Sequence, residues 1–309
     1  MNPLKEKLNE ILKVISTDKK IIYLDYPIHF NIWDLAIYHW TETFFRENNI
    51  EILERFNIHN LSYNRIKNLI KKHWDILFLW HWGWNMWDTY FEKAELKRRD
   101  FAKTFINQEI VFLPQSIHYK NIENLKTSID IYNKSNRTVM VRDIPSFELI
   151  KENYPKANTF LMPDMAYYLA NSEYINNFKN HDRELKEKLI ISRIDEEKID
   201  KEISQNSEIE TTDWLLMTWF FIKISWYTIA WLLKVLSIFN LNSKFLTNLW
   251  YKISKKLLSK GFNKLKNYKV IETDRLHGFI MSNLLWKVII TSDNYYGKIK
   301  NYKKTWNLK

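Results

Sequence analysis

The chain has 309 residues and a mass of 37.9 kDa, which is enough for one large domain or two smaller ones. Hydrophobic residues make up 46% and charged residues 27%, as in ordinary globular proteins, and the absence of Cys excludes disulfide scaffolds and cysteine-ligated metal sites. The formal net charge of +11 arises from lysines interspersed with acidic residues, a pattern typical of a solvated surface, so we expect no nucleic-acid partner.

The first half of the chain alternates short apolar runs with helical patterns. Five of these runs are predicted to be buried strands, at 21–25, 75–79, 109–113, 138–142 and 158–162. Each is followed by a polar or Pro-containing turn and, in most cases, by a helical stretch. This alternation predicts a parallel sheet with helices on both faces.

A second, looser set of strands is predicted at 189–192, 269–273 and 287–291. The polar, charge-rich segment 171–188 lies between the two sets and is the best candidate for a domain boundary. We therefore expect an α/β fold of two Rossmann-like parallel-sheet domains that face each other across a cleft. The N-terminal domain is expected over 1–178 and the C-terminal domain over 179–309.

The segment 214–239 is the most apolar part of the chain. It is long enough to cross a bilayer, but Lys223 and Lys234 interrupt it. Three interpretations stay open: a buried helix, a helix at a membrane surface with its lysines reaching the headgroups, and a membrane span. Because the N-terminus has no apolar run that would direct secretion, we expect a cytoplasmic protein, either free or peripheral at the inner face of the membrane.

In doubly wound sheets, ligands bind at the carboxyl ends of the strands. The residues that follow the predicted strands are rich in Arg, His, Asp and Asn. Arg275 and His277 lie between the strand at 269–273 and an apolar helical pattern, where a guanidinium, an imidazole and a helix N-terminus suit an anionic ligand. An ion pair with Asp274 and a capping His are the alternative. Arg142 and His118 follow other strands and are weaker candidates by themselves.

These pieces, taken in order, resemble one family. The motifs are PQSI at 114–117, VRD at 141–143, PD-x-A at 163–166, R-x-D-x-E at 193–197, TDRLHG at 273–278, SDN-x-YGK at 292–298 and TW at 305–306. In this order they closely resemble the polysaccharide pyruvyl transferases, from about Asn31 to Trp306. The resemblance implies a two-domain fold like that of GT-B glycosyltransferases. It also implies transfer of pyruvate from phosphoenolpyruvate onto two hydroxyls of a sugar as a ketal, with no metal or organic cofactor.

The implied acceptors are saccharides of cell-surface polymers, or their lipid-linked or nucleotide-linked precursors. Phosphoenolpyruvate carries a carboxylate and a phosphate, so Arg275 and Arg142 are the candidate cations that bind it, with the backbone of Leu276 close to the donor. His277 is the first candidate for the acid/base and His118 the second. Residues that could bind substrate from strand ends and loops are Asp34, Asn85, Asp88, Gln115, Asp293, Asn294 and Lys298. Several of these could instead be turn-formers or helix caps.

The sequence departs from the family pattern at five positions where glycine is usual. Tryptophan stands there instead, at Trp33, Trp82, Trp84, Trp87 and Trp286, in a chain with 14 Trp and only 4 Gly. Independent replacements would scatter over several residue types, so we expect a single cause: a UGA codon that the source cell reads as glycine. A truly Trp-rich relative is the alternative.

Indole rings in loops that approach a phosphate or a sugar would fill the space that glycine leaves. We therefore expect Trp→Gly at these five positions to restore activity that the chain as written lacks. Trp214 and Trp306 fall where the family has Trp and are expected to be genuine. The remaining tryptophans stay undecided: Trp40, Trp74, Trp80, Trp219, Trp226, Trp231 and Trp250.

Two other functions stay open. A glycosyltransferase on the same scaffold would use a nucleotide sugar and would bind a uridine nucleotide rather than phosphoenolpyruvate. A non-catalytic scaffold for polymer assembly would touch anionic lipid through its basic face and the segment 214–239.

Overall fold

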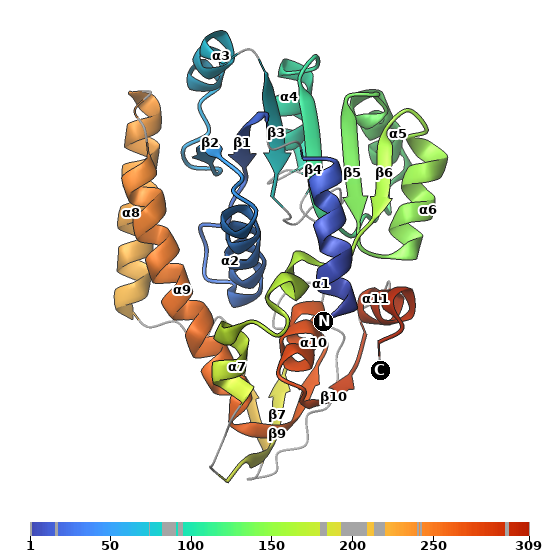
Figure 1. The fold of residues 1–309 in the computed structure, drawn as a ribbon, viewed down its shortest axis with the longest axis vertical. Coiled ribbons are helices and arrows are strands. Elements are labelled where there is room, and N and C mark those ends of the chain that lie inside the picture. Colours follow the sequence, from blue (N-terminus) through green and yellow to red (C-terminus); the bar gives the residue numbers. More distant parts are fainter. Residues whose placement is uncertain are drawn as a thin grey trace.

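The computed structural model describes residues 2–15, 18–73, 75–81, 91, 95–179, 184–192, 209–212, 220–239, 241, 243–293 and 297–308. Within these ranges the chain forms two parallel β-sheets, one of six strands and one of four, each covered by helices (Figure 1). The predicted α/β fold of two GT-B-like parallel-sheet domains is confirmed.

The first sheet has the strand order β2-β1-β3-β4-β5-β6, and all of its strands run parallel. Its strands are β1 (Lys20–Leu24), β2 (Ile52–Phe56), β3 (Ile76–Trp80), β4 (Glu109–Gln115), β5 (Arg137–Val141) and β6 (Asn158–Leu161). Five of them match the predicted strands to within about two residues. The edge strand β2 was not predicted, because Glu54 and Arg55 interrupt its apolar pattern.

Helix α1 (Pro3–Leu8) and the short 3₁₀ turn η1 (Asn9–Lys13) precede the first strand. In the described ranges, five helices connect the strands in the usual crossover manner: α2 (Ile32–Glu47), α3 (Tyr63–Lys72), α4 (Leu96–Thr104), α5 (Ile122–Tyr132) and α6 (Ile144–Asn153). Asn31 caps α2 and Asp143 caps α6, each by accepting a hydrogen bond from a backbone N–H of the first turn. These caps fix two helix N-termini at the carboxyl edge of the sheet.

The second sheet has the strand order β10-β9-β7-β8 and is again parallel. Its strands are β7 (Lys186–Ile191), β8 (Ile209–Thr212), β9 (Tyr268–Thr273) and β10 (Val288–Thr291). The elements around it are η3 (Met165–Leu169), α7 (Glu173–Lys179), α8 (Phe220–Ile238), α9 (Lys244–Lys266), α10 (Leu276–Leu284) and α11 (Lys298–Trp306). The three strands predicted for this half are confirmed, and β8 is an addition.

The two halves share one hydrophobic core. A single cluster of buried side chains runs from Tyr23 and Leu77 of the first sheet to Phe262 and Ile271 of the second half. Helix α2 is buried along most of its length and packs against α9, which passes beside it in Figure 1. This shared core fixes the facing edges of the two sheets relative to each other.

The C-terminal helix α11 returns to the first domain. The indole Nε1–H of Trp306 donates to the carbonyl oxygen of Arg142 at 2.8 Å, and Thr305 Oγ1 accepts from the backbone N–H of Ile144 at 3.1 Å. Tyr302 is fully buried and its hydroxyl accepts from the backbone N–H of Asp164 at 3.0 Å. The last helix therefore supports two strand ends of the other half.

The apolar segment predicted at 214–239 contains α8, which begins at Phe220, while residues 213–219 lie outside the described residues. Ile229 and Leu233 of α8 are buried, whereas Tyr227 and Trp231 are exposed. No helix in the described ranges is both long enough and apolar enough to span a membrane.

Candidate active site

Three polar side chains from the two halves meet at the facing strand ends. Arg142 directly follows β5, Asp164 follows β6, and His277 lies in the first turn of α10. Asp164 Oδ2 accepts a hydrogen bond from Arg142 Nη1 at 2.6 Å and lies 3.2 Å from His277 Nε2. Arg142 Nη1 also lies 3.3 Å from the same imidazole nitrogen. All three side chains are buried, so the structure brings a compact charged cluster together between the domains.

The loop after β4 holds Arg142 in place from a second side. Ser116 Oγ accepts a hydrogen bond from Arg142 Nε at 2.9 Å and donates to the carboxylate of Asp143. Asp143 in turn accepts from Ser146 in the first turn of α6. The guanidinium is thus oriented by fixed partners before any ligand binds, which lowers the cost of binding an anion there.

The turn from β9 into α10 explains the glycine of the RLHG motif. The backbone N–H of Arg275 donates to Thr273 Oγ1 at 3.1 Å. A Cβ at Gly278 would lie 2.3 Å from the same oxygen, far inside van der Waals contact. Only glycine therefore allows α10 to pack this closely on β9, and this packing sets the positions of Arg275 and His277.

The electrostatics of the cluster keep Asp164 ionised. Burial acts to raise the pKa of Asp164, but the charge and hydrogen bond of His277 and the charge of Arg142 outweigh it and lower the pKa to about 2. Burial lowers the pKa of His277 below its ordinary value, although Asp164 opposes this effect. Since the imidazole is then mostly neutral at pH 7, the ion pair with Arg142 is the contact that holds the Asp164 charge.

The imidazole of His277 has two possible hydrogen-bond partners at one nitrogen. A protonated Nε2 donates to Asp164, whereas an unprotonated Nε2 accepts from Arg142. His277 can therefore gain or lose a proton at Nε2 and still keep a hydrogen bond. This is the behaviour expected of a group that transfers protons.

Two further predicted residues lie beside the cluster. Asp34 is buried in the first turn of α2, accepts a hydrogen bond from Asn31 Nδ2 at 2.9 Å, and lies close enough for its charge to act on His277. Gln115, at the end of β4, is 2% exposed, and its Nε2 has no hydrogen-bond partner within the described part of the chain. A buried donor without a partner is a candidate for binding a ligand oxygen.

The other predicted site residues are distributed as follows. Leu276 is the first, buried residue of α10, and His118 is half-buried three residues beyond Gln115. Asp293 accepts from the backbone N–H groups of Ile299 and Lys300 at 3.0 and 2.7 Å, so it caps α11, which begins at Lys298. A role as a helix cap is one of the alternatives that the sequence analysis left open for these residues.

Asn85, Asp88 and Asn294 lie outside the described residues. Among the residues that are described, no three His, Cys, Asp or Glu side chains are grouped so that they could hold a metal ion.

The sequence analysis missed the central residue of the cluster. Asp164 appears in the PD-x-A motif directly after a strand, but an Asp after Pro is a common turn-former, so nothing in the sequence alone distinguishes it. Asp164 can be recognised as a site residue only from the strand order: β6 lies next to β5, so the residues that follow the two strands lie at the same edge of the sheet.

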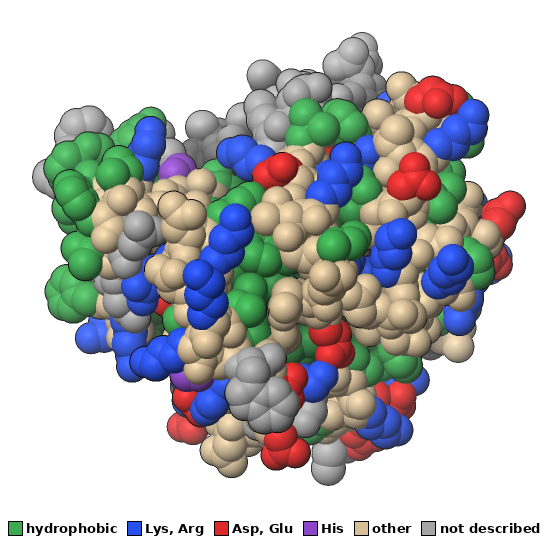
Figure 2. Space-filling view, turned by 90° about the horizontal axis from the view of Figure 1, so that it is seen from above, with side chains coloured by type: hydrophobic (Ala, Val, Ile, Leu, Met, Phe, Trp, Pro, Cys, Tyr) green, Lys and Arg blue, Asp and Glu red, His purple; other side chains and the backbone are tan. Residues whose placement is uncertain are grey.

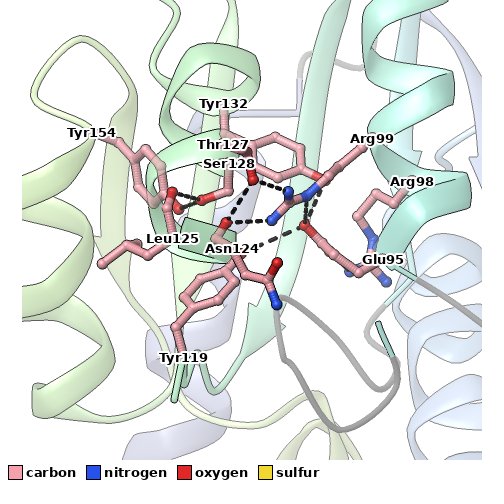
Figure 3. A network of polar contacts seen from close by, with 10 residues as sticks. All are labelled: Glu95, Arg98, Arg99, Tyr119, Asn124, Leu125, Thr127, Ser128, Tyr132 and Tyr154. Atoms are coloured by element: carbon pink, nitrogen blue, oxygen red, sulfur yellow. Dashed lines mark hydrogen bonds and ion pairs between the residues drawn. The ribbon is translucent and has the colours of Figure 1, made fainter. Parts of the chain in front are cut away.

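A second buried network supports the neighbouring loops. Figure 3 shows the carboxylate of Glu95 between the side chains of α4 and α5. Glu95 is fully buried and accepts hydrogen bonds from Arg99 Nε at 2.8 Å, Arg98 Nη1 at 3.1 Å and Tyr132 Oη at 3.3 Å. Tyr119, which follows His118, reaches the same carboxylate at 3.5 Å. The network therefore ties the loop after β4 to the start of α4.

The tryptophans at expected glycine positions differ in their surroundings. Trp286 has a φ of +58°, in the left-handed region that favours glycine, and its backbone N–H and that of Lys287 close the C-terminus of α10 by bonding to Asn283 and Ser282. Trp33 is buried in the first turn of α2. Trp82, Trp84 and Trp87 lie outside the described residues.

The fold and the cluster together define a two-domain, GT-B-like α/β protein whose candidate site lies between its parallel sheets. The family model for polysaccharide pyruvyl transferases matches residues 6–284. The chain therefore belongs to the polysaccharide pyruvyl transferase family, as the sequence motifs predicted.

Relatives of known name agree with this assignment. EpsO of Bacillus subtilis (strain 168), whose name describes it as a pyruvyl transferase, is 33% identical over 310 residues that cover 99% of this chain and 91% of EpsO. Pyruvyl transferase 1 of Schizosaccharomyces pombe is 25% identical over 296 residues, which cover 93% of this chain and 70% of that protein. An uncharacterised protein from Klebsiella pneumoniae has the same fold, with a TM-score of 0.60 and 19% identity over 98% of this chain and 94% of that one.

Proposed function

We propose that this protein transfers pyruvate from phosphoenolpyruvate onto two hydroxyls of a saccharide as a ketal. The observation that carries the proposal is the buried cluster of Arg142, Asp164 and His277, with Arg275 at the adjacent helix N-terminus. The donor has two anionic groups, and we propose that the guanidiniums of Arg142 and Arg275, which come from different domains, bind them. Guanidinium forks match both carboxylate and phosphate oxygens.

The reaction balances with one proton-transfer group and no oxidant. The CH₂ carbon of the donor gains a proton and becomes a methyl group, while its central carbon forms two C–O bonds to the sugar oxygens. The bond from this central carbon to the phosphate oxygen breaks, and phosphate leaves. The two protons lost by the sugar hydroxyls go to the methyl group and to the phosphate.

His277 is the group proposed to carry these protons. Because burial lowers its pKa, the imidazole is mostly neutral before the donor binds and can accept a proton from a sugar hydroxyl. The negative charges of the bound donor then favour the imidazolium, which can protonate the CH₂ carbon. Asp164 is proposed to orient His277 and Arg142 rather than to react itself.

The remaining polar groups at the strand ends are proposed to bind the acceptor. The Nε2 of Gln115, which has no partner among the described residues, and the carboxylate of Asp34 offer a donor and an acceptor, as sugar hydroxyls require. His118 stays the second candidate for an acid/base. We propose that the acceptor is a lipid-linked or nucleotide-linked saccharide of a cell-surface polymer, modified on the cytoplasmic side before export, and that no cofactor takes part.

The experiment is phosphate release from phosphoenolpyruvate in the presence of such saccharides, with the ketal detected by mass spectrometry. It is run on the chain as written and on a version with glycine at positions 33, 82, 84, 87 and 286. We expect Arg275→Ala and His277→Ala to lower the rate of the active version by about 10²-fold or more. Full activity in both variants would refute the proposed site.

A further inference from the structure

The end of the hairpin formed by α8 and α9 exposes a group of large apolar side chains. These are Ile238 at 67%, Phe239 at 67%, Leu241 at 54% and Phe245 at 78% exposure, and we call these four residues the hairpin tip. Figure 2 shows hydrophobic side chains gathered at the left of the face seen from above, where the α8–α9 end lies, with Lys and Arg side chains beside them. Single exposed apolar residues are ordinary, but a contiguous group marks an interaction site.

The tip is exposed although α9 buries its own apolar face against the rest of the protein. Helix α9 buries Leu246, Trp250, Leu257 and Phe262 on its inner side, and Trp250 Nε1 donates to the carbonyl oxygen of Pro27 at 2.7 Å. Asn60 Nδ2 also donates to the buried Ser243 Oγ at 2.8 Å, which fastens the start of α9 to the turn after β2. The tip is therefore held in place with its apolar side chains outward.

The segment of the chain that contains the tip is basic. Between residues 214 and 271 the sequence contains no Asp or Glu. The same segment contains the lysines Lys223, Lys234, Lys244, Lys252, Lys255, Lys256, Lys260, Lys264, Lys266 and Lys269. On α9, the exposed lysines at 252, 255, 256 and 260 continue along the outer side from the tip. A positive surface with an apolar end complements a partner that has an anionic surface and an apolar interior.

We propose that the hairpin tip inserts into the headgroup region of a bilayer rich in anionic lipid and holds the protein at the membrane surface. The apolar side chains enter the interface while the lysines contact the lipid phosphates. The proposed contact is a peripheral one, and no helix of the described ranges is both long enough and apolar enough to span a bilayer. The inference rests on the surface of α8 and α9 and does not depend on the reaction proposed for the site.

The test is flotation of the full chain with vesicles of phosphatidylglycerol and phosphatidylcholine, compared with vesicles of phosphatidylcholine alone. Phe245→Asp is the test variant and Ile122→Asp is its matched control. Both residues lie exposed in the first turn of a helix, α9 and α5, so both variants add the same charge in a position that tolerates an acid. Circular dichroism melts establish that both variants are folded.

We expect binding to the anionic vesicles to be at least tenfold tighter than to phosphatidylcholine alone and to fall at least tenfold in 0.5 M salt. Phe245→Asp should weaken it at least tenfold and Ile122→Asp less than twofold. Equal binding to both kinds of vesicle, or equal loss in both variants, would overturn the proposal. Self-association in sedimentation equilibrium that Phe245→Asp abolishes, without vesicle binding, would instead assign the tip to a second copy of the chain.

Discussion

Asp164 is the residue on which the geometry of the candidate site depends. It joins an arginine from the first domain to a histidine from the second, with contacts of 2.6 and 3.2 Å. Its backbone N–H is bound by Tyr302 of α11, so the carboxylate is held from both domains. A change here should alter proton transfer without removing a group that reacts.

Asp164→Asn should lower kcat/KM and move the acid limb of its pH profile to lower pH. The sign follows from the charges: the carboxylate raises the pKa of His277 and partly offsets burial, so its removal leaves the pKa of His277 lower still. Since the base must be unprotonated to accept a proton, the active form persists to more acidic pH. A limb that stays in place or moves to higher pH would contradict the assignment of His277.

Gly278 allows no side chain. Gly278→Ala should lower stability by about 1–3 kcal/mol, because the new methyl group would meet Thr273 Oγ1 and push α10 away from β9. The displacement would also move Arg275 and His277, so activity should fall further than stability alone explains. Denaturant unfolding and turnover of the folded fraction measure the two effects separately. An alanine variant with full activity would contradict this account of the turn.

Trp286 tests whether glycine belongs at that position. Its φ of +58° costs a residue with a Cβ about 1–2 kcal/mol, and its indole packs under Lys179 Nζ, 3.7 Å from the ring centre. Trp286→Ala and Trp286→Gly both lose the Lys179 contact, but only glycine relieves the backbone. We therefore expect the glycine variant to be more stable than the alanine variant by about 1 kcal/mol in urea unfolding. Equal stabilities would remove the backbone argument for glycine.

The coding DNA tests the hypothesis that UGA codons were read as glycine in the source cell. Codons 33, 82, 84, 87 and 286 should all be UGA, whereas codons 214 and 306 should be UGG. The hydrogen bond from Trp306 to Arg142 shows an indole with a specific partner, as expected of a genuine tryptophan. Trp40, by contrast, is buried with an indole nitrogen that has no partner among the described residues, so its codon is the most informative of the undecided ones. UGG at all five expected glycine positions would refute the hypothesis.

At the scale of elements, the strands that the sequence predicted are those with continuous runs of apolar residues. Strands with continuous apolar runs, such as β3 and β4, were predicted because burial on both faces requires such residues. The edge strand β2 was missed because its charges are paired: Arg55 bonds Glu42 and Glu54 bonds Arg65, so they tolerate partial burial. The RLHG site was predictable from residue types at a strand end. The contact of Asp164 with Arg142 and His277 was not, because it depends on which strands are neighbours.

Glu95 links α4, α5 and the loop after β4, and its loss should be costly. Glu95→Gln leaves the guanidinium of Arg99 without its acidic partner and that of Arg98 with only the more distant Asp25, at 3.7 Å, so we expect a loss of about 3–5 kcal/mol of folding free energy. Glu123→Gln is the control, because its ion pair with Lys126 on α5 is exposed and should contribute less than about 0.5 kcal/mol. Similar unfolding midpoints for the two variants would show that the network is not a structural anchor.

At the scale of the whole molecule, buried histidines make stability depend on pH. Burial lowers the pKa of His39 and of His81 to about 3. The unfolded chain binds these protons near pH 6.5 and the folded chain does not, so stability is complete above pH 6.5 and falls as the pH drops below it. Between pH 8 and pH 5 we expect a loss of about 2 kcal/mol for each histidine.

Urea unfolding at several pH values measures this dependence. His39→Gln keeps a hydrogen-bonding side chain beside Ser254 but cannot gain a proton, so it should remove the share of His39, about 2 kcal/mol, from the loss at pH 5. A wild-type stability that is unchanged between pH 8 and pH 5 would contradict the burial of both imidazoles.

The central claim is that arginines from two domains hold one anionic donor beside His277. Calorimetric titration of phosphoenolpyruvate into the version with glycine at the five positions tests it most directly, with Arg275→Ala as the comparison. The account predicts one binding site per chain and an affinity at least tenfold weaker in Arg275→Ala. Equal affinity in the two proteins, or no binding of phosphoenolpyruvate by the folded glycine version, would contradict it.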